Sequence, residues 1–318
     1  MADGRPAELT VIFVSYNTRA LTLKAIETVR AETSDTAIDI AVWDNASHDG
    51  SADAIAEAFP DVRLFRSPDN LGFAAGNNEV AKHVETEWLL LLNTDTETHE
   101  GAVDRLLAFA KARPQAGIYG GRTVYPDGSL NAASCWNRIT PWSAFCSATG
   151  LTAVFKGSPL FDTEAIGGWA RDSVREVDIV VGCFLLIRRA LWEELGGFDT
   201  RYWMYGEEAD LCLRARARGY RPAITPDAVI MHLVGQSTTK NRRAERRALV
   251  AKARSTLIRT HWPAALRPFG LAMMWLWGAG RRYGSGALAT LLPREVFRER
   301  AALWRAVWQA RADWLAGY

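Results

Sequence analysis

The sequence lacks the glycine-rich motifs that identify many nucleotide-binding enzymes. No G-x-G-x-x-G follows the first strand-like segment, and the chain of 318 residues has no G-x-x-x-x-G-K-[ST]. These absences argue against a typical NAD-dependent enzyme and against a P-loop ATPase. A nucleotide site in this chain would have to neutralise phosphate by other means, and a divalent cation is the obvious candidate.

Cysteine and long apolar runs are also scarce. The four cysteines form no C-x-x-C pair, which favours unpaired thiols in a reducing compartment. The N-terminal stretch MADGRPAELT contains no apolar signal region. The longest apolar stretch, residues 269–280, is shorter than the ~20 residues that span a bilayer. We therefore expect a cytoplasmic protein, with a peripheral position on the inner face of the cell membrane left open.

The net charge of +2 hides an uneven distribution along the chain. Residues 240–318 hold 16 lysines and arginines against 4 acids, whereas residues 1–239 hold 22 against 32. This split predicts an acidic catalytic domain at 1–239 and a basic extension at 240–318 with a partner of its own.

Strand-like and helix-like segments alternate at the start of the chain, which predicts a parallel sheet covered by helices on both faces. The strand-like segments are 8–15, 38–44, 62–67 and 88–93, and the helix-like segments are 18–32, 51–59 and 73–84. Further on, Asp127-Gly128 predicts a hairpin turn. Residues 177–189 are predicted to form a strand, and residues 207–219 are predicted to form a helix. Residues 135–176 are expected to form an irregular substrate loop or a small subdomain.

Three of the predicted strands end in polar residues. They are Ser15-Tyr16-Asn17, Asp44-Asn45 and Asn93-Thr94-Asp95. Because open parallel sheets bind ligands at the carboxyl ends of their strands, these residues predict a ligand site at that edge. The alternative is that they are ordinary turn residues and helix caps.

Six motifs in order make the sequence similar to a known family. They read VIFVSYNT, VWDNASHDGS, NLGFAAGNN, LLNTDTE, GCFLLIRRALWEELGGFDTRYWMYGEEADLCLRARARGY and IMHLVGQST. Together they resemble the inverting glycosyltransferases of family 2, closest to the bacterial rhamnosyltransferase-like branch, over residues 9 to about 240. The resemblance implies a GT-A type, Rossmann-like α/β fold with a mostly parallel sheet flanked by helices. Here a helical extension rich in basic residues and tryptophan follows it.

The resemblance implies a nucleotide-sugar site around Asp44, which would contact the base or ribose. Tyr16 could equally be a packing aromatic. The residues assigned to this site are Ser15, Tyr16, Asn17, Asp44, Asn77, Asn93 and Thr94.

Asn93-Thr94-Asp95 looks like the family's D-x-D metal motif, which implies that Asp95 holds Mg²⁺ or Mn²⁺ against the donor's diphosphate. His232 matches a histidine that ligates the metal or touches the diphosphate, although a lone histidine beside a strand is often structural. Ser237, Thr238, Arg242 and Arg243 are further candidates for phosphate contact.

The segment GEEADLC resembles the part of the family that carries the general base. The family usually has Glu-Asp-x-Asp there, so Glu208 takes the place of the catalytic Asp and is one methylene longer. Glu207 and Asp210 would orient neighbours or contact the acceptor. The alternative, which does not exclude this role, is that acids simply stabilise a helix N-terminus.

The activity implied is a metal-dependent single displacement from a nucleotide sugar to a glycan or polyprenyl-linked acceptor in cell-surface polysaccharide synthesis. By family likeness the donor is dTDP-L-rhamnose. A UDP-hexose donor is the alternative within the family. A non-catalytic sugar-nucleotide-binding or scaffold protein is the alternative from another class, and only the change at Glu208 favours it.

The basic extension is rich in tryptophan, and residues 294–315 read as one helix. Tryptophan and arginine together suit a membrane interface, whereas a helical hairpin with a tryptophan core is the alternative. Nucleic-acid binding fits poorly because the apolar content is high. The sequence does not predict an oligomeric state.

Overall fold

The structure is a computed structural model, and it describes residues 6–233 and 243–318. These residues form two compact units. The sheet unit comprises residues 6–136 and 170–233, and the helical unit comprises residues 137–169 and 243–318. Residues 137–169 thus group with the C-terminal helices.

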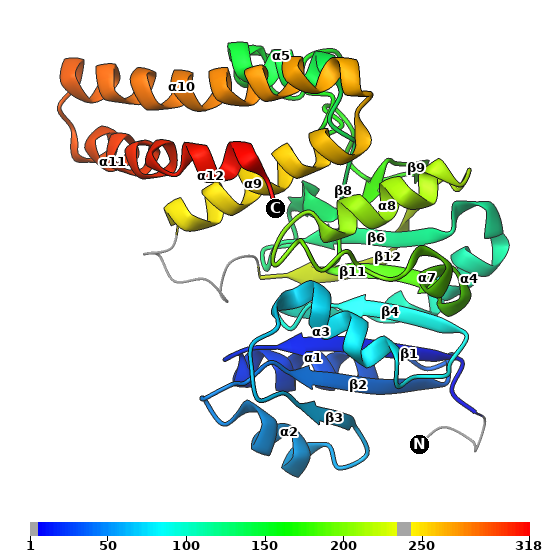
Figure 1. Ribbon diagram of the computed structural model, residues 1–318. Coiled ribbons are helices and arrows are strands. Elements are labelled where there is room, and N and C mark those ends of the chain that lie inside the picture. Colours follow the sequence, from blue (N-terminus) through cyan, green and yellow to red (C-terminus); the bar gives the residue numbers. More distant parts are fainter. Residues whose placement is uncertain (1–5, 234–242) are drawn as a thin grey trace. The chain divides into compact units, whose positions relative to one another are not determined.

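The sheet unit is built on a ten-stranded sheet, of which β3, β2, β1 and β4 lie one above the other in Figure 1. The first four strands in spatial order, β3, β2, β1 and β4, are parallel, whereas β11 runs antiparallel between β4 and β6. The mostly parallel α/β fold predicted from the sequence is confirmed. The strands, in spatial order, are β3 (Arg63–Arg66), β2 (Ile38–Asp44), β1 (Leu9–Ser15), β4 (Trp88–Leu92), β11 (Phe184–Arg188), β6 (Ile118–Val124), β12 (Ala223–His232) and β5 (Thr96–Thr98), with β7 (Leu130–Asn131) beside β6 and β9 (Arg175–Glu176) beside β12.

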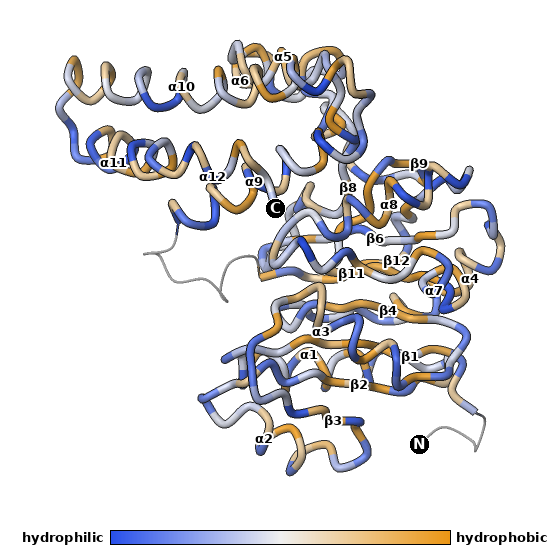
Figure 2. The backbone as a smooth tube through the Cα atoms, viewed as in Figure 1, coloured by the Kyte–Doolittle hydropathy of each residue, from blue (hydrophilic) through white to orange (hydrophobic). Residues whose placement is uncertain are grey.

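Burial explains why the central strands form. All five residues of β4 are buried, as expected for a strand covered on both faces. Each fully buried leucine side chain contributes roughly 1.5–3 kcal/mol of burial free energy. Figure 2 shows the central strands as a band of mainly hydrophobic residues.

Six α-helices belong to the described part of the sheet unit. In α1, Ala25, Ile26 and Val29 are fully buried, in agreement with the apolar spacing of that segment. The helices are α1 (Arg19–Ala31), α2 (Ser51–Ala58), α3 (Gly72–Ala81), α4 (Ala102–Ala112), α7 (Arg189–Leu195) and α8 (Glu207–Ala217), with short 3₁₀ turns at Pro114–Ala116 and Ala132–Ser134.

The predicted strand at 177–189 is wrong in one respect, because the structure divides it in two. β10 (Ile179–Val180) pairs with β8 (Cys135–Trp136) in a separate small sheet, and only β11 joins the main sheet. The hairpin turn predicted at Asp127-Gly128 is confirmed, because β6 and β7 pair antiparallel across it and Gly128 has a φ of 78°.

The helical unit has its own core, formed by residues that include Trp262, Met274 and Trp314. Its helices are α5 (Pro141–Thr149), α6 (Leu151–Val154), α9 (Arg243–His261), α10 (Arg267–Leu291), α11 (Glu295–Gln309) and α12 (Arg311–Ala316), with a 3₁₀ turn at Ala264–Leu266.

Two expectations for this unit need correction. The segment expected to be irregular contains α5, which begins with a capping box at Thr140 and Ser143. The single helix expected at 294–315 is interrupted at Ala310. There the buried Trp314 donates its indole N–H to the carbonyl of Val307 at 2.9 Å.

Candidate functional site

Asp95 lies in the turn between β4 and the edge strand β5, and its neighbours hold that turn on two sides. The Thr96 hydroxyl donates to the carbonyl of Asn93 at 2.6 Å, and the Leu233 N–H donates to the carbonyl of Asp95 at 2.9 Å. On the other side, the Asn93 N–H donates to the carbonyl of Cys183 at 3.2 Å. The buried Asp95 carboxylate therefore sits on a fixed backbone.

His232, at the end of β12, is the partner of Asp95. Its Nε2 lies 3.2 Å from Asp95 Oδ1. Burial by itself lowers the pKa of His232, but the hydrogen bond to Asp95 and the nearby Cys183 raise this pKa to about 10. The structure therefore brings together the two residues that the sequence analysis assigned to a metal, as a charged pair.

The Asp95–His232 pair can supply part of a metal site. In the described ranges, no three His, Cys, Asp or Glu side chains converge as a complete metal-binding group. His232 Nδ1 is buried and makes no hydrogen bond with any described residue. Mg²⁺ and Mn²⁺ take oxygen ligands, and in many nucleotide enzymes substrate phosphates complete their shell. The pair therefore fits a divalent ion held jointly with a phosphate, provided that His232 gives up its proton.

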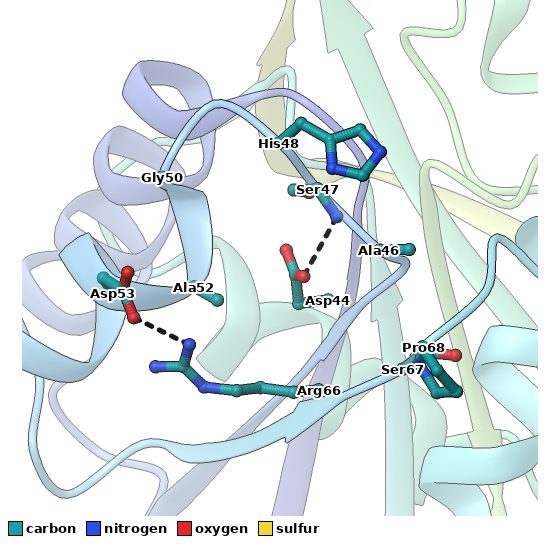
Figure 3. A pocket seen from close by; sticks show the side chains of 10 residues that line it. All are labelled: Asp44, Ala46, Ser47, His48, Gly50, Ala52, Asp53, Arg66, Ser67 and Pro68. Carbon is teal, nitrogen blue, oxygen red and sulfur yellow. Dashed lines mark hydrogen bonds and ion pairs between the residues drawn. The ribbon is translucent and has the colours of Figure 1, made fainter.

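A pocket of about 270 Å³ opens at the carboxyl end of β2 (Figure 3). The Ser47 N–H donates to Asp44 Oδ2 at 3.1 Å, whereas Asp44 Oδ1 is buried without a partner in the described structure. Arg66 pairs with Asp53 at 2.7 Å on the other side of the pocket. Asp44 therefore keeps an acceptor oxygen for a ligand hydroxyl or N–H. The lining residues are Asp44, Ala46, Ser47, His48, Gly50, Ala52, Asp53, Arg66, Ser67 and Pro68.

Asn17 shapes the loop that forms one wall of this pocket. It adopts a left-handed backbone conformation (φ 53°), which asparagine tolerates better than most residues. Its N–H donates to the Ser47 hydroxyl at 3.0 Å, and its Oδ1 accepts from the His48 N–H at 2.8 Å. The adjacent Tyr16 is 44% exposed and available for contact with a ligand.

Three other residues assigned to the nucleotide-sugar site are buried in the protein. The Ser15 hydroxyl lies 3.1 Å from that of Thr22, which belongs to α1. Asn77 donates from Nδ2 to the Phe73 carbonyl of its own helix at 2.9 Å. Thr94 is also buried. None of the three lines the pocket at Asp44.

Glu207 and Glu208 begin α8 directly after Gly206, which has a φ of 96°. Glu207 is buried, and its Oε2 has no hydrogen-bond partner within the described residues. Burial, and then the charge of Glu208, raise the pKa of Glu207 well above its ordinary value. Burial also raises the pKa of the half-buried Glu208. Both carboxyl groups are therefore protonated more easily than exposed glutamates.

Asp210 has a supporting position one turn further along α8. Its Oδ2 accepts from Arg214 Nε at 2.6 Å, and Arg214 also donates to the carbonyls of Leu195 and Gly197 at 2.5 and 2.8 Å. Asp210 thus fixes α8 to the loop that follows α7.

The segment between β10 and β11 lies near both Glu208 and the turn that carries Asp95. A Cβ built on Gly182 would lie 3.7 Å from Glu208 Cβ and 3.4 Å from the Phe73 ring, so Gly182 is next to both residues. The next residue, Cys183, contacts the Asn93 turn and influences His232. The sequence analysis missed Gly182 and Cys183 because both lie in a run interpreted as one strand. Ser237, Thr238 and Arg242 lie outside the described residues, and Arg243 is the first residue of α9.

The family model described as glycosyl transferase family 2 matches residues 10–195, more than half of the chain. The chain belongs to this family, and its class is that of the glycosyltransferases.

The relatives include two bacterial proteins. The chain is 28% identical over 232 residues to N-acetylglucosaminyl-diphospho-decaprenol L-rhamnosyltransferase of Mycobacterium tuberculosis, covering 64% of this chain and 69% of the relative. It is 28% identical over 227 residues to O-antigen biosynthesis protein RfbC of Myxococcus xanthus, covering 70% of this chain and 17% of that protein. The family member described here is thus near the rhamnosyltransferase branch.

A solved structure shows the same fold. The mannosyltransferase PcManGT from Pyrobaculum calidifontis, in complex with GDP-Man and Mn²⁺, superposes with a TM-score of 0.59 at 19% identity, covering 98% of this chain and 88% of that one.

Proposed function

We propose that the chain transfers L-rhamnose from dTDP-L-rhamnose to a glycan or lipid-linked acceptor, with inversion at the anomeric carbon. The observation that carries this proposal is the acid pair at the start of α8, in the same unit as the Asp95–His232 pair. The mycobacterial relative named as an L-rhamnosyltransferase supports the choice of sugar and a lipid-linked acceptor.

Glu208 is the proposed general base. Its pKa is raised by burial, so its carboxylate accepts a proton more readily than an exposed one does. Glu208 removes the proton of an acceptor hydroxyl, the hydroxyl oxygen attacks the anomeric carbon, and the bond to the nucleoside diphosphate breaks on the opposite face. An oxocarbenium-like transition state is expected, as in other glycosyl chemistry.

The donor is proposed to lie along the carboxyl edge of the sheet. Asp44 accepts a hydrogen bond from the base or ribose through its unpartnered Oδ1. Asp95 and His232 are the residues that would hold Mg²⁺ or Mn²⁺. Bound there, the ion would supply positive charge for the departing diphosphate.

The helical unit is the proposed point of contact with a membrane surface. Helix α10 has only three charged residues among 25, and it exposes Phe269, Leu276 and Tyr283 at seven-residue spacing. Such a face suits a helix lying in the interface. No helix of residues 6–233 or 243–318 has the combined length and apolarity to cross a bilayer.

A panel of nucleotide sugars tests this function. Release of nucleoside diphosphate is measured for dTDP-L-rhamnose and for UDP-hexoses, with Mg²⁺, with Mn²⁺ and with chelator, in the presence of a polyprenyl-diphosphate glycan acceptor. The proposal predicts turnover of dTDP-L-rhamnose that chelator abolishes. Turnover of a UDP-hexose alone would overturn the donor assignment. A thermal shift with donor but no turnover of any donor would indicate a binding protein instead.

A further inference from the structure

Two arginines of the helical unit lie against the same tryptophan. The guanidinium carbon of Arg247, from α9, is 5.2 Å from the centre of the Trp304 ring, and that of Arg281, from α10, is 5.5 Å from it. Arg281 also lies 4.8 Å from the ring of Trp277. Trp304 is buried in α11, so residues of three helices hold the two cations against one ring.

The charged groups that shift the pKa of Arg281 are all arginines. Burial, and then Arg247, Arg254 and Arg300, lower the pKa of Arg281 to about 10. Arg254 is neutralised by Glu164, at 2.6 Å. Within the described residues, no carboxylate forms an ion pair with Arg247, Arg281 or Arg300. Like charges held together without a counterion repel, so the cluster as folded favours the arrival of an anion.

We propose that Arg247 and Arg281 form a binding site for a phosphate or diphosphate group, distinct from the proposed donor site in the sheet unit. A guanidinium can stack on an aromatic ring with its face and still present N–H donors at its edge, and two such donors match phosphate oxygens. The ligand is a phosphate of either a membrane lipid headgroup or a soluble diphosphate compound.

A second arginine–tryptophan contact in the same unit shows what simple packing looks like. Arg311 lies 5.1 Å from the Trp308 ring and also donates to the Trp308 carbonyl at 3.4 Å. Among the described residues, no second arginine lies over the Trp308 ring. Arg311 therefore provides a matched control, because it keeps the stacking contact and lacks the cluster of like charge.

The test uses the full chain in chelator and without nucleotide sugar, so that metal-dependent binding in the sheet unit does not contribute. Inorganic pyrophosphate binding is measured by calorimetry, and co-flotation is measured with vesicles of phosphatidylcholine alone or with phosphatidylglycerol. Arg247→Gln, Arg281→Gln and Arg311→Gln are compared with wild type, and circular dichroism checks that each variant is folded.

The proposal predicts binding of pyrophosphate, of anionic vesicles or of both. Arg247→Gln and Arg281→Gln are expected to weaken it on the order of tenfold each, the loss expected for one charge-assisted hydrogen-bonding group. Arg311→Gln should bind as wild type does. Pyrophosphate binding identifies a soluble diphosphate as sufficient, whereas binding to anionic vesicles alone identifies the lipid headgroup. Equal binding by Arg281→Gln and wild type, or no binding of either probe by wild type, would overturn the proposal.

Discussion

The sheet unit and the helical unit place charge in opposite ways. In the sheet unit, carboxylates are buried at strand and helix ends, where Asp44 and Glu207 each keep an oxygen without a partner. In the helical unit, arginines gather on a tryptophan core. Buried acids with spare acceptor oxygens suit cations, hydroxyls and protons, whereas clustered arginines suit anions. The comparison suggests that sugar transfer belongs to the sheet unit and phosphate contact to the helical unit.

Among the substitutions that compare the two units, the largest expected effect on activity comes from removing the proposed metal ligand, Asp95. Asp95→Ala should lower kcat/KM by about 10²–10³-fold, the usual cost of losing a group that stabilises transition-state charge. It should also abolish the thermal shift caused by Mn²⁺ with donor. Asp127→Ala, in the exposed β6–β7 turn, is the control and should change neither quantity. Wild-type turnover by Asp95→Ala would remove Asp95 from the site.

A substitution in the proposed nucleotide pocket should change donor binding and leave turnover nearly unchanged. Asp44→Ala removes the unpartnered acceptor in the pocket, so the donor KM should rise by roughly 10–100-fold with kcat little changed. Steady-state kinetics with varied donor measures this change. Asp61→Ala, which breaks an exposed pair with Arg30, is the control. An unchanged KM would show that Asp44 is only a turn residue.

A substitution in the helical unit should lower the stability of the protein and leave donor binding unchanged. Arg254→Met leaves the partly buried Glu164 without its partner, and we expect a loss of about 1–3 kcal/mol in unfolding free energy. Chemical denaturation measures the loss. Lys252→Met, whose partner Asp313 is 66% exposed, should cost much less. A raised donor KM in Arg254→Met would contradict the separation of roles.

The smallest effect concerns Glu207. Folding raises its pKa above the ordinary value of 4.5, so folding favours its protonated form. Its contribution to stability is therefore present at acid pH and is lost as the pH rises through the folded value. Glu207→Gln cannot ionise, and its melting temperature relative to wild type should increase between pH 5 and pH 8. Glu57→Gln, on the exposed side of α2, should show no such trend.

Local patterns in the sequence predicted much of the sheet unit. β1, β2 and β4 were found because apolar runs and turn residues are properties of neighbouring residues. The three-residue strand β5 was missed, because Thr96–Thr98 becomes a strand only by pairing with β12 more than 120 residues later. The break between β10 and β11 was missed for the same reason, because it follows from strand pairing: β10 pairs with β8, whereas β11 pairs with β4 and β6.

The candidate site shows the same limit. Polar strand ends pointed to Asp44 and Asp95, but the sequence could not show that Ser15 bonds inside the protein or that His232 contacts Asp95. The roles of Asp95, His232 and Glu208 came from the family resemblance, and they stay predictions. The fold, the family and the enzyme class are confirmed.

The most direct test of the account is the turnover number of Glu208→Gln with saturating donor and acceptor. The variant keeps the size of the side chain and removes the proton acceptor. We predict a loss in kcat of about 10²–10⁴-fold with the donor KM unchanged, and partial recovery in Glu208→Asp, which has the residue usual in the family. A Glu208→Gln enzyme with kcat near that of wild type would contradict the account.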